Sequence, residues 1–210
     1  MKKFPTRALT LIEWSFILDP MRVKDEIKQD ALFEATVKLV NEIGFASSSV
    51  SKIAKQASVS PATIYVYHKN KEELLVSTYV RIKQLMGLSV QENFDASQPI
   101  RDILKQVWAN IFSFVAEHPA YFQYMEQFSN SPYSELVNKE EVEAYFEPVI
   151  RIILTGIELK IIKDVNFDIL SAFIFFPIMA LANPRHCRNF ELSPENTEAA
   201  FNLAWDAIRR

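Results

Sequence analysis

Two short helical segments separated by a three-residue break, within positions 50–67, most constrain how this chain can fold. The first, VSKIAKQA, follows Ser49, and the second, PATIYVY, follows Ser60. Serine is favoured just before a helix because its hydroxyl accepts a hydrogen bond from a backbone N–H of the first turn. Proline suits the first helical position, where its missing N–H is not needed. This spacing predicts a helix-turn-helix over about residues 47–67.

The apolar positions of this pattern predict how the two segments pack. They are Ile53, Ala54, Ala57, Val59 and Ile64. These side chains are small or compact enough for two helices to cross closely over a shared core. The other positions then lie toward the outer face or the ends, namely Ser60, Pro61, Ala62, Thr63, Tyr65 and Tyr67. In a helix-turn-helix, the start of the second helix is the part that reaches base edges in the DNA major groove.

Local charge favours a nucleic-acid partner, although the charge of the whole chain does not. The 210 residues carry a net charge of −3, and the pI is near 5.7. No acidic residue occurs from Ile43 to Lys71, whereas this stretch contains four lysines, Lys52, Lys55, Lys69 and Lys71. Residues 22–84 hold ten basic and seven acidic residues, and residues 85–210 hold ten and seventeen. A phosphate-facing surface needs local positive charge, not a basic whole, so binding to DNA stays open.

Longer helices are predicted on both sides of this motif. Ala31, Ala35 and Leu39 recur every four residues within 24–45, which indicates an amphipathic helix of about 20 residues. Gly44 lies where a C-terminal cap is expected. Asn70 is placed to cap a long helix that starts at Lys71 and runs into the low 90s.

The rest of the chain also predicts helices, and we find no convincing strand or internal repeat. The expected ranges are 99–117, 119–129, 139–161, 167–182 and 194–208. Pro148 and Pro177 fall inside two of these patterns and should kink them. The fold class is therefore all-α. We expect a three-helix module at 22–84 and a larger helical domain at 85–210, which holds 18 of the 26 aromatic residues.

The first twenty residues start basic and then turn apolar, which superficially resembles a secretion signal. Glu13 interrupts the apolar stretch, and no small-residue cleavage site follows. We interpret residues 1–21 as an extension that is disordered or lies upstream of a true start at Met21. A second apolar run, 169–182, is shorter than the roughly 20 residues a membrane helix needs. With its single cysteine, Cys187, the chain is predicted to be cytoplasmic.

Residues 24–75 resemble the DNA-binding domain of the TetR/AcrR family of bacterial transcriptional regulators. The resemblance rests on three stretches in order, ALFEATVKLVNEIGF, SVSKIAKQASVS and PATIYVYHKNKEELL. Three positions depart from the family pattern: Ser58 replaces the usual turn glycine, His68 an aromatic residue, and Ser49 a capping threonine. Ser58 must then tolerate the turn backbone, which can be left-handed.

The resemblance implies which residues contact DNA. These are Ser49, Lys52, Ser60, Pro61, Ala62, Thr63, Tyr65, Tyr67 and Lys71. Pro61, Ala62 and Thr63 are implied at base edges, and most of the others at the phosphate backbone. Tyr65 can equally be a core residue, His68 is better explained by packing, and Lys55 and Lys69 can be plain solvated charges.

The resemblance also implies a homodimer formed by the last two long helices. The candidate interface residues are Phe173, Phe176, Met179, Phe201 and Trp205. The stretch FDILSAFIFFPIMALA is apolar nearly all round and must be covered on every side. A second copy can supply that cover, and burial within the monomer is the alternative.

The larger domain is implied to bind a small molecule. The candidate lining residues are Trp108, Phe112, Tyr121, Tyr124, Met125, Phe128 and Tyr145, with Phe146 also in the cluster. Aromatic residues at helical spacing also simply fill cores, and Glu117, Glu126 and His118 can orient a ligand or lie on the surface.

Neither catalysis nor a metal or other cofactor is predicted. The three histidines are scattered, and no nucleophile elbow, P-loop or HExxH motif is present. We predict a ligand-responsive repressor that binds a pseudo-palindromic DNA operator as a homodimer and is released by a small apolar or amphipathic effector. Two alternatives remain, control by a protein partner, or a helical enzyme or carrier with a decayed DNA-binding module.

Overall fold

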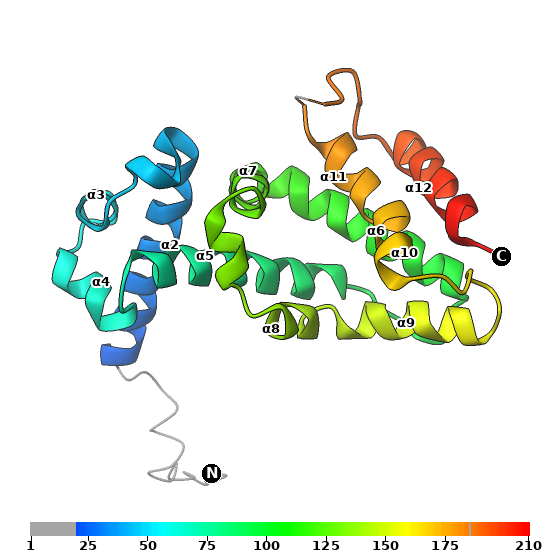
Figure 1. The fold of residues 1–210 in the computed structure, drawn as a ribbon, viewed down its shortest axis with the longest axis horizontal. Coiled ribbons are helices and arrows are strands. Elements are labelled where there is room, and N and C mark those ends of the chain that lie inside the picture. Colours follow the sequence, from blue (N-terminus) through cyan, green and yellow to red (C-terminus); the bar gives the residue numbers. More distant parts are fainter. Residues whose placement is uncertain (1–19, 185) are drawn as a thin grey trace, which may run out of the picture. The chain divides into compact units, whose positions relative to one another are not determined.

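The regular structure of the described chain is helical. The computed structural model describes residues 20–184 and 186–210, so most of the expected N-terminal extension lies outside the described residues. The helices in chain order are α2 (Pro20–Ser47), α3 (Val50–Gln56), α4 (Pro61–Tyr67), α5 (Lys71–Val90), α6 (Ile100–Glu117), α7 (Pro119–Ser129), the short 3₁₀ helix η1 (Pro132–Leu136), α8 (Lys139–Ala144), α9 (Glu147–Glu158), α10 (Phe167–Ile174), α11 (Phe176–Ala182) and α12 (Pro194–Ile208) (Figure 1). The all-α prediction is confirmed.

The chain divides into two compact units between Leu74 and Leu75. This division falls inside α5, whereas the sequence placed the end of the first module near residue 84. Helix α5 is continuous from Lys71 to Val90 and therefore contributes residues to both units.

The first unit has a small apolar core built by α2, α3, α4 and the start of α5. Its buried residues are Leu32, Ala35, Leu39, Ile53, Ala54, Ile64 and Leu74, with Ala57, Val59 and Tyr67 packed against them. All five inward positions predicted in the helix-turn-helix thus belong to this core. Gly44 adopts φ 76° and ψ 167°, a non-helical backbone that ends the long helical run of α2 and kinks it before its last residues, near the cap position expected from the sequence. A positive φ of this kind is readily adopted by glycine.

The turn between α3 and α4 is left-handed at Ser58, as its replacement of a glycine suggested. Ser58 has φ 56°. The N–H of Ser58 donates to the carbonyl of Lys55 at 3.2 Å, and the N–H of Val59 donates to that of Ala54 at 2.9 Å. These bonds close the C-terminus of α3 and direct Val59 toward the core.

Ser58→Gly is expected to stabilise the first unit by about 1 kcal/mol, because a left-handed backbone costs an L-residue about 1–2 kcal/mol that glycine avoids. Chemical unfolding followed by circular dichroism measures the change. Ser51→Gly is the matched control, since Ser51 is exposed within helix α3, where glycine is destabilising. Equal effects of the two substitutions would contradict strain at Ser58.

The second unit contains α6 as its most buried long helix, and prolines set the breaks around it. Pro148 lies in the first turn of α9, and Pro177 in that of α11. The predicted helix 139–161 is therefore split at Tyr145 and Phe146, and the helix 167–182 is split at Phe175. Both expected kinks are confirmed as breaks. The sequence did not predict η1.

Helix α5 passes very close to the break between α8 and α9. A Cβ at Gly87 would lie 2.8 Å from both the Cβ and the carbonyl oxygen of Tyr145. The side-chain amide of Gln91 donates to the carbonyls of Gly87 at 2.9 Å and Tyr145 at 3.2 Å. Glycine at position 87 therefore permits this approach, which brings α5 against the chain segment that follows α8.

Candidate nucleic-acid interface

Both short helices of the helix-turn-helix start with the predicted serine cap. The hydroxyl of Ser49 accepts from the N–H of Lys52 at 3.3 Å. The hydroxyl of Ser60 accepts from the N–H of Thr63 at 3.2 Å and lies 2.9 Å from the Thr63 hydroxyl. The start of α4 is thus fixed by side-chain hydrogen bonds, with Pro61 in its first turn.

The outer face of α4 is exposed to solvent. Pro61 and Ala62 are exposed, and Thr63 is half-buried. Tyr65 is 56% exposed, so it is a surface residue and not part of the core. Val66 is 76% exposed, and the sequence analysis missed it. Its position between two tyrosines on an exposed short helix was the available signal. The face that a DNA groove would meet therefore includes an apolar side chain.

Two of the predicted DNA-contact residues also form hydrogen bonds within the first unit. The Tyr67 hydroxyl donates to the Asp25 carboxylate at 3.0 Å, and desolvation and that carboxylate raise the pKa of Tyr67. The Lys71 ammonium donates to the Phe45 carbonyl at 2.7 Å. The Tyr67 hydroxyl can donate to a phosphate only if it gives up its hydrogen bond to Asp25. The Lys71 ammonium has two further N–H donors, so it can contact a phosphate while it keeps its bond to the Phe45 carbonyl.

The remaining basic residues of the acid-free stretch are exposed. Lys52, Lys55 and Lys69 are all solvent-exposed, and the Lys52 ammonium donates to the Ser47 carbonyl at 3.0 Å. His68 is half-buried, and burial lowers its pKa, which agrees with a packing role. Asn70 caps α5 as predicted, accepting from the N–H of Glu73 at 2.8 Å. The α5 start carries Glu72 and Glu73, and α4 itself is uncharged. The exposed positive charge therefore lies on α3, at Lys52 and Lys55, and at Lys69 in the loop after α4.

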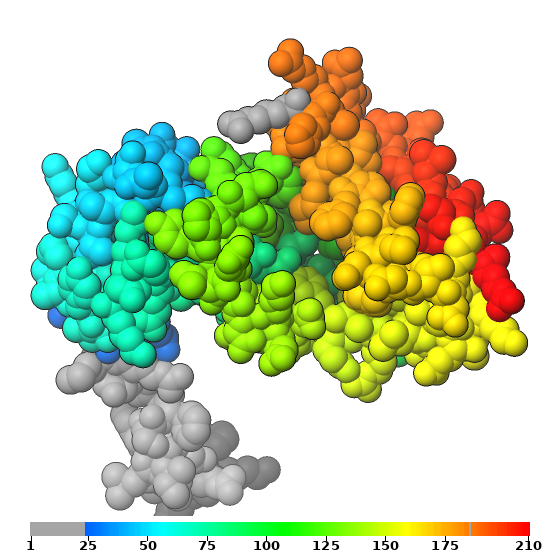
Figure 2. Space-filling model, in the orientation of Figure 1, coloured from blue at the N-terminus to red at the C-terminus, as the bar shows by residue number. Residues whose placement is uncertain are grey.

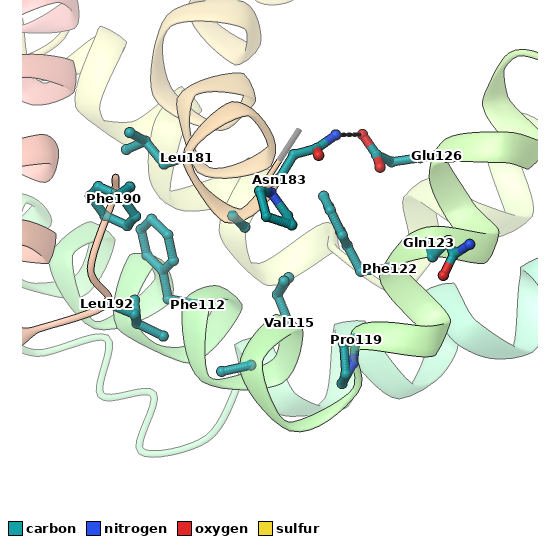
Figure 3. Close-up of a pocket in the computed structure, with 13 residues that line it drawn as sticks. Phe112, Val115, Pro119, Phe122, Gln123, Glu126, Leu181, Asn183, Phe190 and Leu192 are labelled. Atoms are coloured by element: carbon teal, nitrogen blue, oxygen red, sulfur yellow. Dashed lines mark hydrogen bonds between the residues drawn. The ribbon is translucent and has the colours of Figure 1, made fainter. Parts of the chain in front are cut away.

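The second unit contains a cavity of about 530 Å³ between α6, α7 and the end of α11 (Figure 3). Phe112, Phe122 and Phe190 contribute aromatic rings to its wall. The Asn183 amide donates to the Glu126 carboxylate at 2.5 Å, as Figure 3 shows. Phe112 and Glu126 are the residues here that the sequence had suggested for a ligand.

A second cavity, of about 300 Å³, lies between α5, α6 and the helices α8 to α11. Its wall is apolar apart from Lys83, Glu143 and Ser171. Phe146 and Met179 line it, although the sequence had assigned Met179 to a dimer interface. Lys83 and the α5 residues beside it were not predicted, because a charged residue in a helical pattern is ordinarily a solvated one.

Three of the aromatic residues suggested as ligand contacts fill the core instead. Trp108, Tyr124 and Phe128 are fully buried. The Trp108 indole N–H donates to the Ile174 carbonyl at 2.7 Å, and the Tyr124 hydroxyl donates to the Leu75 carbonyl at 2.9 Å. Their polar atoms are therefore satisfied within the protein, and burial raises the pKa of Tyr124.

Three other suggested ligand contacts, Tyr121, Met125 and Tyr145, also lie outside the two cavities, whereas Phe112, Glu126 and Phe146 line them. Met125 is buried, and the Tyr121 ring stacks on His118 at 4.9 Å between centroids. Tyr145 packs against Gly87. Neither cavity is lined by Met125, Tyr121 or Tyr145. The spacing of the aromatic residues left a cavity wall and a core position as alternatives and could not separate them.

Helices α10 and α11 carry large exposed apolar side chains. Helix α10 packs against α12, and both helices reach the surface of the second unit in the view of Figure 2. Ile169, Phe173 and Phe176 are 51%, 56% and 65% exposed. Phe201 and Trp205 of α12 are 0% and 8% exposed, so they cannot bury further area against a partner, and their assignment to an interface is corrected. Leu203, at 75% exposed, is the α12 residue that the sequence analysis missed.

Two sequence families match this chain, one over each part. Residues 32–78 match the family described as bacterial regulatory proteins of the tetR family. Residues 99–209, more than half of the chain, match the family described as the C-terminal domain of tetracyclin-repressor-like proteins. The chain belongs to the TetR family. It is a DNA-binding transcriptional regulator with an N-terminal helix-turn-helix, and it is not an enzyme.

Other TetR-family proteins resemble it along most of their length. A TetR family transcription regulator from Marinobacter aquaeolei VT8 is 34% identical, with a TM-score of 0.82 over 90% of this chain and 98% of its own. A TetR family protein from Vibrio parahaemolyticus is 26% identical, with a TM-score of 0.74 over 87% and 99%. An HTH-type transcriptional regulator from Haemophilus influenzae is 26% identical over 181 residues, 86% of this chain and 95% of its own.

Within the described part of this TetR-family chain, no helix combines the length and apolar character that crossing a membrane requires.

Proposed function

We propose that this TetR-family regulator is a cytoplasmic repressor that binds a pseudo-palindromic operator as a homodimer and is released by a small apolar or amphipathic effector. The observation that carries the proposal is the capped, exposed start of α4 within a stretch free of acidic residues. A second helix exposed in this way can enter the major groove.

The proposed DNA contacts divide into two groups. Pro61, Ala62 and Thr63 at the start of α4 meet base edges, where an apolar side chain suits a thymine methyl group. The residues around them hold the phosphate backbone and fix the register of α4 in the groove, namely Ser49, Lys52, Ser60, Tyr65, Tyr67 and Lys71. The positive end of the α5 dipole adds a favourable interaction for phosphate near Lys71.

Tyr65→Ala and Lys71→Ala are each expected to weaken DNA binding about tenfold, because each removes one charge-assisted or polar phosphate contact per subunit. Lys71→Ala should also lower the slope of log affinity against log salt by about one per lost contact. Fluorescence anisotropy with a labelled operator at several salt concentrations measures both. Tyr65→Phe, which keeps the ring, is the control for the hydroxyl. Unchanged specific binding in both alanine variants would overturn this placement of the contacts.

The apolar face of α10 and α11, with Leu203 of α12, is proposed as the homodimer interface. A second copy related by two-fold symmetry places identical faces together and sets two α4 helices about one DNA turn apart. Phe173 and Phe176 are the large exposed rings that such an interface would bury. Met179, which lines the second cavity, is also included in the proposed interface.

Phe176→Ala is expected to weaken the dimer about 30-fold, because each subunit loses burial worth about 1–2 kcal/mol. Sedimentation velocity over a concentration series measures the dissociation constant. Leu136→Ala is the matched control, because Leu136 is 58% exposed on η1, away from this face. An unchanged constant for Phe176→Ala would exclude this face as the interface.

Helix α5 is the proposed route from effector to operator. It carries Lys71 at its start and Lys83, Met86 and Val90 along the wall of the second cavity. An effector that prefers a different position of α5 would shift the population toward a spacing of the two α4 helices that no longer fits the operator.

A further inference from the structure

The second cavity combines an apolar wall with one basic side chain, and this combination limits what it can bind. Met86, Val107, Ile111, Phe146 and Phe175 supply aliphatic and aromatic surface. Among the described residues that line it, the charged ones are Lys83 and Glu143, and Glu143 is exposed at the surface. Lys83 is therefore the charged group in the less exposed part of the wall.

The Lys83 ammonium has little to compensate its charge. It lies 4.8 Å from the centroid of the Phe146 ring, which provides a cation–π contact. Within the part of the chain that the structure describes, no hydrogen bond or ion pair to this ammonium is found. Burial lowers the pKa of Lys83 from 10.5 to about 8. At neutral pH the group is still mostly charged, so an anion placed beside it would be strongly favoured.

We propose that this cavity binds an amphipathic carboxylate, with the apolar chain against the wall from α6, α9 and α11 and the carboxylate paired with Lys83. The inference rests on the proposed function, since it names the chemical class of its effector. A neutral apolar ligand would leave the half-buried Lys83 ammonium without an anionic partner. A cationic ligand would add like-charge repulsion in a site of low dielectric.

The larger cavity does not compete for the same ligand. Its charged group is Glu126, which would repel a carboxylate and is already engaged by the Asn183 amide. It also has no lining residue from α5, because its wall is built by residues 112–126 and 181–192. The smaller cavity is the one whose contents contact the helix that continues into the DNA-binding unit.

The volume of the cavity determines how long an apolar chain the test ligand can have. Its volume of about 300 Å³ corresponds to about ten water molecules at roughly 30 Å³ each in the liquid. This lies at the lower end of small-molecule sites, which span about 300–1,000 Å³. Decanoate is therefore a suitable probe, and 1-decanol and decylamine present the same chain with a neutral and a cationic head.

The test is calorimetric titration of the full chain with decanoate, 1-decanol and decylamine below their aggregation concentrations. We expect wild-type protein to bind decanoate at least about tenfold more tightly than 1-decanol, as a buried charge-assisted pair implies. Lys83→Met should abolish this preference, and Lys83→Arg should retain it. Lys105→Met is the matched control, because Lys105 is an exposed lysine outside the cavity that pairs with Glu198 at 2.7 Å.

The outcomes separate this inference from the proposed function. Equal affinity for decanoate and 1-decanol, a preference that survives in Lys83→Met, or no binding of decanoate would each overturn the carboxylate site. Operator affinity of the same wild-type sample is measured in parallel without any ligand. Loss of the carboxylate site with intact operator binding would leave the DNA-binding proposal standing. Ligand binding without operator binding would overturn the proposed function alone.

Discussion

Ala62→Glu is expected to reduce operator binding more than a thousandfold while leaving the fold intact. Ala62 is exposed at the start of α4, where the proposal places base edges and phosphates. A carboxylate there faces the negative charge of DNA, and like charges in an interface cost several kcal/mol at each of two half-sites. The same carboxylate is favourable for the helix itself, because it lies near the positive end of the α4 dipole.

The matched control is Ala120→Glu. Ala120 is exposed and follows Pro119 at the start of α7, just as Ala62 follows Pro61 at the start of α4. Both variants change the net charge equally and place an acid in the same helical position. Anisotropy titrations should show near wild-type binding for Ala120→Glu. Comparable binding by the two variants would mean that α4 does not enter the DNA groove.

Lys83→Met is expected to raise the free energy of unfolding of the second unit by about 3 kcal/mol at pH 7. The lysine pKa falls from 10.5 unfolded to about 8 folded, and each pKa unit corresponds to about 1.4 kcal/mol. Methionine has a similar length and no charge to desolvate, so the cost of burying an unpaired ammonium disappears. Urea unfolding followed by tryptophan fluorescence reports mainly on this unit, because two of the three tryptophans, Trp108 and Trp205, lie in it.

The pH dependence of the difference in unfolding free energy between wild type and Lys83→Met identifies its cause. Below pH 8, Lys83 is protonated in both states, and the full cost is present. Between pH 8 and 10.5 the unfolded chain holds the proton more tightly than the folded chain, so wild-type stability rises with pH relative to the variant. The advantage of Lys83→Met should therefore shrink over this range. A difference that is constant from pH 7 to 10, or one equally large in Lys105→Met, would refute a buried, unpaired Lys83.

Local rules were sufficient to predict the first unit from the sequence. The caps at Ser49, Ser60 and Asn70 depend on neighbouring residues only, and so does the left-handed turn at Ser58. Each of these features follows from the chemistry of one side chain and the backbone next to it. The residue roles at the DNA surface are predictions that the resemblance to the family implies.

The site in the second unit could not be predicted in the same way. Trp108 and Phe146 have similar apolar character in the sequence, yet Trp108 fills the core and Phe146 lines a cavity. Phe201 and Phe173 differ likewise, with Phe201 buried and Phe173 exposed. Which face of a helix meets a cavity, the core or solvent depends on contacts between residues far apart in the chain. The place of Lys83 in a cavity wall depends on how several helices pack around it, so its role could not be predicted from the sequence.

The central claim is that this chain reads a two-fold operator through paired α4 helices. The most direct test is selection of bound DNA from a random pool by the purified wild-type protein, followed by sequencing. We expect an enriched palindromic motif with two half-sites about one helical turn apart, and loss of that enrichment in Ala62→Glu. A pool that remains random, or a motif with a single asymmetric half-site, would contradict it.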